Sequence, residues 1–404
     1  MVAARQRAMA CDPRSGDRSS LLWALYFDAP LSRAELARRT GLAAATVNAT
    51  LTDLLREGAV TEAGAGAGHP ALLRVAPGHR HVIGVDATRD RVRVELFDLA
   101  LASRAKADYP LRSGRHDTGL IIRHTLTGLR TVLDTAGVPR AEVLGVAVAT
   151  ACHPPARGPA APVPAAAARA RPAGQETALL RRLLSAGSGL PVFIDDSGHA
   201  LGQAEMWRGA GRGTRHAVFA RVGTSVDASV LTRGRHPARP AAGCRTSRWG
   251  HTTARPDGRR CRCGARGCLE AYLGADAVLE RYRQARRGRP VRGEDAEAAF
   301  AALVAAADGS AAARRVVDET TEYLGTGLAL LVDLFNPERI ILGGWAGALL
   351  GAHRLPVIRE AVAARSLRRS AAPAGVELCR LGPDAAALGA ATRPVEHYLR
   401  AGAR

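Results

Sequence analysis

Apolar residues near the N-terminus recur at the spacing of short amphipathic helices. Leucines three and four positions apart predict a helix over residues 20–28, and a longer apolar stripe predicts another over residues 44–57. Between them, Ser32 and Glu35 have the spacing of a capping box, and Gly41 supplies the turn that ends this middle helix. This order of helices is the plan of a helix-turn-helix DNA-binding domain, although an unspecific three-helix bundle has the same pattern.

Two short strands follow the third helix. Residues 60–62 and 72–75 are expected to form two strands around a Gly-rich tip. This wing completes a predicted winged helix-turn-helix over residues 18–78. Residues 1–17 have no periodicity, and we expect them to form a flexible tail.

From residue 79 to residue 404 the pattern alternates between strands and helices, which predicts an α/β architecture. A Pro-, Ala- and Arg-rich stretch at residues 153–174 interrupts it and is predicted to be a loop. The predicted strands lie at residues 81–85, 92–96, 143–149, 191–194, 217–222, 228–232 and 339–342, and predicted helices at 117–135 and 197–208.

One His and three Cys are the main candidates for metal chemistry. They lie within twenty residues of one another: His251, Cys261, Cys263 and Cys268. One imidazole and three thiolates form a closed tetrahedral site for one structural zinc ion, with no position left for a substrate. The alternatives are unligated reduced thiols or a disulfide, which is unusual in a reducing compartment.

The residues around this cluster carry a family resemblance. A Gly-His pair, nine residues and then the pattern CxCGxxGCxE resemble the motif of the ROK family, which comprises repressors, uncharacterised reading frames and sugar kinases. The N-terminal segment SRAELARRTGL and the wing segment GHPALL resemble the DNA-binding domain of ROK repressors. The resemblance implies an actin-like sugar-kinase fold with two α/β lobes, whose C-terminal helix returns to the first lobe.

Both phosphate loops of the kinase members are altered in this chain. Residues 86–90 match the DxGGT loop but lack both Gly, and Asp90 stands in place of Thr. Residues 223–229 match the GTGxGxG loop but keep only the first Gly, and Asp227 adds a second carboxylate. Because phosphate needs close backbone N–H groups and few nearby carboxylates, we expect no kinase activity and no catalytic residue, Asp196 being only a degenerate match to the general base.

The sugar-binding positions of the family are partly retained. The matching residues are Asp195, Asp196, Arg248, His251 and Glu270. Arg248 replaces a Glu of the family, which reverses the charge at that position. Two interpretations follow: the site binds an anionic effector such as a sugar phosphate, or Arg248 pairs with Asp195 or Asp196 in a site without a ligand.

Polar residues of the helix-turn-helix segment are the candidates for DNA contact. Asn48 could recognise an adenine edge, and Thr and Arg side chains could contact phosphates. The expected DNA-binding residues are Arg33, Arg38, Arg39, Thr46, Asn48, Thr50, Thr52 and His69. Two positions depart from the family: Ala43 replaces the usual Ser cap of the third helix, and His69 replaces the Arg of the wing.

Composition adds little to this assignment. The net charge is +20, but residues 1–78 hold nine Arg against seven acidic residues, so the positive charge is not concentrated in the predicted DNA-binding segment. The absence of a signal-like or membrane-length apolar run predicts a cytoplasmic protein. We therefore expect a transcriptional regulator, of sugar-related genes by family resemblance, that binds an inverted-repeat DNA operator as a homodimer or homotetramer. The alternatives are a sugar kinase with an extra domain and a ligand-independent regulator controlled by a partner protein.

Overall fold

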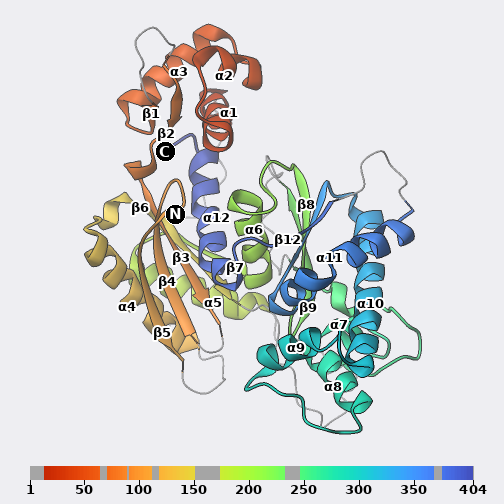
Figure 1. The fold of residues 1–404 in the computed structure, drawn as a ribbon. Helices are drawn as coiled ribbons and strands as arrows, with labels where there is room; N and C mark the ends of the chain where they lie inside the picture. The colour runs from red at the N-terminus through yellow and green to blue at the C-terminus, as the bar shows by residue number, and fades with distance from the viewer. Residues whose placement is uncertain are drawn as a thin grey trace. The chain divides into compact units, whose positions relative to one another are not determined.

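The computed structural model describes residues 13–63, 71–88, 91–111, 118–150, 173–232, 246–367 and 375–403. The chain divides into two compact units. The first comprises residues 1–148, 180–193 and 391–404, and the second comprises residues 149–179 and 194–390. Figure 1 traces the elements of both along the chain.

Three helices and a two-stranded wing form the N-terminal part of the first unit, as predicted. They are α1 (Pro13–Asp28), α2 (Arg33–Thr40), α3 (Ala44–Arg56), β1 (Val60–Glu62) and β2 (Leu73–Val75). Leu36, Leu51 and Leu73 are buried between them, so the helices and the wing share one small core.

Local contacts explain the boundaries of these helices. The Ser32 hydroxyl accepts the Glu35 N–H, and the Glu35 carboxylate accepts the Ser32 N–H, which confirms the capping box. Ala43, by contrast, gives α3 no side-chain cap. α1 begins at Pro13, although the apolar pattern predicted a start at residue 20, and part of the predicted tail is therefore helical. Its first turns lack leucines, so periodicity alone could not reveal them.

A five-stranded sheet in the order β5-β4-β3-β6-β7 belongs mainly to the first unit, although the last residues of β6 and β7 and the start of α5 are assigned to the second. β3, β4 and β5 form an antiparallel meander. Its elements are η1 (Pro77–His79), β3 (His81–Ala87), β4 (Arg91–Asp98), β5 (Ser103–Pro110), α4 (Thr118–Ala136), η2 (Arg140–Glu142), β6 (Val143–Thr150), α5 (Ala173–Ser188) and β7 (Val192–Asp196).

The second unit repeats this strand order as β10-β9-β8-β11-β12. β8, β9 and β10 are antiparallel neighbours, and β11 is parallel to both β8 and β12. Its elements are α6 (Ser197–Arg208), β8 (His216–Val222), β9 (Val226–Thr232), β10 (Thr246–Ser247), η3 (Trp249–His251), α7 (Glu270–Leu273), α8 (Ala275–Ala285), α9 (Ala296–Ala305), α10 (Ala311–Phe335), β11 (Arg339–Gly343), α11 (Trp345–Arg365) and β12 (Gly375–Leu378).

An antiparallel meander with the same strand order in both sheets is typical of the actin-like α/β fold, which confirms the predicted fold class. After η4 (Pro383–Ala385), the last helix α12 (Ala386–Arg400) begins in the second unit, and residues 391–404 belong to the first. The predicted loop at residues 153–174 lies outside the described residues, except for residues 173–174, which already belong to α5. No helix in the described ranges has the length and apolar character needed to cross a membrane.

Candidate functional site

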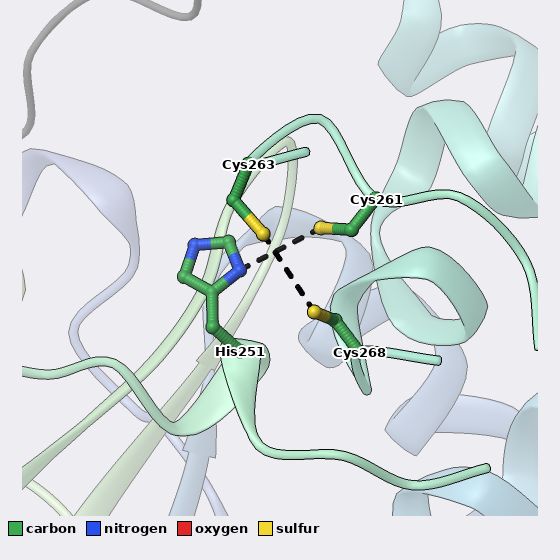
Figure 2. A group of neighbouring side chains, drawn as sticks. All are labelled: His251, Cys261, Cys263 and Cys268. Atoms are coloured by element: carbon green, nitrogen blue, oxygen red, sulfur yellow. Dashed lines mark hydrogen bonds between the residues drawn. The ribbon is translucent and has the colours of Figure 1, made fainter. Parts of the chain in front are cut away.

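The four predicted metal ligands converge on one point of the second unit. Figure 2 shows the side chains of His251, Cys261, Cys263 and Cys268 pointing toward one another from η3 and the following loop. The Cys263 and Cys268 sulfurs are 3.7 Å apart, and the Cys261 sulfur is 3.6 Å from His251 Nδ1. Ligands of a tetrahedral zinc ion lie about 3.8 Å apart for two sulfurs and about 3.6 Å apart for sulfur and nitrogen. The four residues could therefore hold a metal ion without rearrangement.

The loop between the ligands is shaped by backbone contacts. Gly264 and Gly267 have φ values of +95° and +75°, which Gly adopts without strain. The Cys261 N–H donates to the Ala265 carbonyl at 2.8 Å, which closes the turn around Cys263. The three cysteines of the cluster are free thiols in the structure, and the Cys263 and Cys268 sulfurs are 3.7 Å apart, well beyond the length of a disulfide bond.

Burial favours the neutral thiol form of Cys261 and Cys268 in the metal-free chain. It raises the pKa of Cys261 to about 12 and also raises the pKa of Cys268. A bound cation reverses this preference because it stabilises the thiolate directly. The four ligand atoms are already close together before any metal binds.

Residues 252–269, between η3 and α7, carry the three cysteines and are called the metal-ligand loop. Arg262 connects this loop to Glu270, one of the residues predicted to bind an effector. Its Nε and Nη2 donate to the two Glu270 oxygens at 2.6 and 3.0 Å. The Val226 N–H also donates to Glu270, at 2.9 Å, and the Glu270 side chain is only 5% exposed. Both oxygens of this buried carboxylate are thus occupied by partners within the protein.

Asp195 and Asp196, at the end of β7, are occupied as well. Asp195 Oδ2 lies 2.8 Å from Nδ1 of buried His199, and Asp195 Oδ1 accepts the Asp196 N–H. Asp196 Oδ1 caps α6 by accepting the N–H groups of Gly198 and His199. Arg248 is exposed, and Asp195 pairs with His199 rather than with Arg248.

Residues 223–229, the predicted match to the second phosphate loop, include Asp227, which forms an ion pair across β8 and β9. Arg221 lies opposite Asp227, and its Nε is 3.0 Å from both carboxylate oxygens. Asp227 is 2% exposed and Arg221 is 22% exposed. A buried carboxylate and its counter-ion therefore lie at the segment that the sequence predicts to match the second phosphate loop. In residues 86–90, the predicted match to the first phosphate loop, positions 89–90 lie outside the described residues.

Replacing Arg221 with Ala is expected to lower the free energy of unfolding by about 3 kcal/mol, because Asp227 would remain buried without its counter-ion. The low end of the usual range applies, since the guanidinium is partly exposed. Chemical denaturation would measure the change. Arg212→Ala, which removes the same charge from an exposed position, is the control and should have little effect. Equal stability of the two variants would contradict this assignment of the pair.

The predicted DNA-binding residues lie on α2 and α3 wherever the structure describes them. Asn48 and Thr52 are exposed, and Thr46 and Thr50 are half-buried. Arg33 donates to Asn48 Oδ1 at 3.2 Å, and Arg39 pairs with Asp28 at 3.0 Å. Arg38 is exposed, whereas His69 lies outside the described residues.

Comparison with known proteins gives the family. The model of the ROK family matches residues 82–393, and a model of the DprA winged helix domain matches residues 5–66. Since the first match spans most of the chain, the protein belongs to the ROK family.

Its relatives include both repressors and kinases. A xylose repressor of Caldicellulosiruptor bescii is 25% identical over 91% of this chain and 92% of its own. A glucokinase of Halalkalibacterium halodurans is 32% identical over a segment that covers 50% of this chain and 62% of the glucokinase. One similar solved structure is a ROK family transcriptional regulator described as a homologue of the E. coli MLC protein. It superposes on this chain with a TM-score of 0.74 at 21% identity, and the match covers 97% of this chain and 98% of that protein's chain. That structure supports the fold.

Three residues of the site escaped the sequence analysis: His199, Arg221 and Arg262. His199 follows Asp195 by four residues, a spacing that places the two together at a helix start. Arg262 lies between two metal ligands, so its position was evident but its partner was not. Arg221 and Asp227 could be paired only once the hairpin register was known.

Proposed function

We propose that this protein is a transcriptional repressor of sugar-related genes. Its winged helix binds an inverted-repeat operator as a homodimer, and its ROK domain senses an effector. The observation that carries the proposal is the exposed face of α3 (Ala44–Arg56), in a winged helix that precedes a ROK domain. The xylose repressor named above matches the chain across both parts.

The metal site supports a structural role. His251, Cys261, Cys263 and Cys268 would hold one zinc ion, and a site with four protein ligands leaves no position for substrate. The ion would fix the loop from which Arg262 reaches Glu270. Zinc therefore stabilises the part of the second unit that contains Glu270, a residue predicted to bind the effector.

The same contacts bear on the effector. Asp195, Asp196 and Glu270 each have partners within the protein, so a neutral sugar would have to compete for them. An anionic effector such as a sugar phosphate could instead engage the exposed Arg248. Control by a partner protein without any small ligand is the second candidate, and the occupied carboxylates favour it equally.

We expect no ATP-dependent phosphorylation of hexoses or hexosamines. The Arg221–Asp227 pair occupies the second phosphate loop, and buried Asp227 would repel the phosphates. A coupled assay of ADP release over a sugar panel measures this directly, with a ROK glucokinase as the positive control. Sugar-dependent turnover that disappears in Asp196→Ala would overturn the assignment and make the protein a kinase.

A further inference from the structure

Arg18 joins three segments of the first unit that are far apart in the sequence. Its Nε donates to the Gly402 carbonyl at 2.7 Å, and its Nη1 donates to Glu57 Oε1 at 3.0 Å. Its Nη2 forms a close ion pair with the other oxygen of Glu57. Arg18 is only 8% exposed, and its bond to the Gly402 carbonyl is buried, whereas the Glu57 side chain is 42% exposed.

Each partner marks the end of a helix. Glu57 is the C-terminal cap of α3, the helix that we propose enters the major groove. Gly402 lies in the turn that follows α12. Three donors in one planar fork can serve both partners at once, which the single ammonium group of Lys cannot do with the same geometry. The guanidinium therefore fixes the end of α3 against the end of the chain.

The C-terminal turn has a defined structure of its own. The Ala401 and Ala403 N–H groups donate to the His397 and Tyr398 carbonyls at 2.9 and 3.1 Å. Gly402 has a φ of +72°, and a Cβ added there would lie 3.0 Å from Arg18 Cβ. The position thus requires Gly both for its backbone conformation and for the close approach of Arg18.

A hollow of about 850 Å³ places this turn beside the proposed DNA-binding face. Thr46, Thr50 and Asp53 of α3 line it together with Arg80 and Ala403. Two of the candidate DNA-binding residues therefore share a surface depression with the last residues of the chain.

We propose that Arg18 is a positioning residue for DNA recognition and that the turn at residues 401–403 is a functional part of the DNA-binding winged helix. The proposal rests on the proposed DNA-binding function. In this proposal Arg18, which also lines the hollow but is only 8% exposed, acts through α3 and not through a contact of its own with DNA. It sets the orientation of α3, which sequence-specific contacts require, and leaves the phosphate-binding charges on the surface unchanged.

The test uses the full-length protein and an operator selected from random duplex DNA. Arg18→Gln, Arg18→Lys and a chain ending at Ala401 should each bind the operator roughly 2- to 30-fold more weakly. Binding to unrelated duplex DNA, and the salt dependence of that binding, should stay unchanged, whereas general unfolding would weaken both kinds of binding. Arg104→Gln, at an exposed position of β5, is the control.

A double variant tests whether Arg18 and the turn act together. If Arg18 and the turn act through one network, Arg18→Gln combined with the truncation should lose no more operator affinity than the more affected single variant. Full operator affinity in the truncated chain and in Arg18→Lys would overturn the proposal, even if either variant melts at a lower temperature. Failure of the unaltered protein to select any operator would instead refute the DNA-binding function itself.

Discussion

Replacing Cys268 with Ser is expected to abolish stoichiometric zinc binding and to lower the free energy of unfolding by about 4 kcal/mol or more. The Cys268 sulfur is 3.7 Å from that of Cys263, at the spacing of two thiolates on one zinc ion, and a hydroxyl is a poor substitute ligand. The loss should extend beyond the ligands, because Cys261 and Cys268 pack with Ala271, Tyr272 and Tyr323 in one apolar cluster. Zinc content by elemental analysis and thermal melting would measure both effects.

Cys379→Ser is the matched control for this experiment. Cys379 is a half-buried free thiol outside the metal-ligand cluster, and burial raises its pKa to about 11, so it is a neutral thiol at neutral pH. The control should keep one zinc ion per chain. If Cys268→Ser also keeps its zinc and melts like the unaltered protein, the four residues do not form a structural metal site.

Replacing Asn48 with Ala is expected to weaken operator binding roughly 5- to 150-fold and to relax the base preference at one A·T pair in each half-site. The Asn48 side chain is exposed on α3, and Arg33 donates to its Oδ1 at 3.2 Å. That bond orients the amide and leaves one lone pair and both N–H groups for an adenine edge. Titration of the selected operator and of its single-base variants would measure the change.

Gln284→Ala is the control, because it truncates an exposed amide on α8 in the second unit. It should bind like the unaltered protein. A uniform loss of affinity in Asn48→Ala, with every base preference unchanged, would contradict base recognition and indicate a contact with the DNA backbone instead.

Local sequence patterns predicted much of the fold and the metal-ligand cluster. The capping box of Ser32 and Glu35 depends on residues three positions apart, and the spacing of Cys261, Cys263 and Cys268 needs only short turns. α5 also has an apolar pattern, with Leu179, Leu180, Leu183 and Leu184, which the sequence analysis passed over. Edge strand β5 has alternating exposed and half-buried residues, including Arg104 and Lys106, and so lacks the apolar alternation that marks a strand.

Long-range pairings could not be predicted in this way. Arg18 and Gly402 are 384 positions apart, and neither has a distinctive neighbouring pattern. Arg221 meets Asp227 only because of the hairpin register, and the partner of Arg262 depends on how the metal-ligand loop folds over α7. Such contacts are selected by tertiary packing, which single-sequence periodicity does not encode. The domain boundary near residue 78 and the individual DNA and effector contacts stay predictions.

The most direct test of the account is selection of binding sites from a random duplex library by the full-length protein. A DNA-binding homodimer predicts one enriched inverted repeat, with half-site centres about one helical turn or a small multiple of it apart. Release of the protein from this repeat by a sugar or sugar phosphate would identify the effector. Binding that none of these compounds affects would favour control by a protein partner. Enrichment of no sequence at all would contradict the central claim that this ROK protein is a transcriptional repressor.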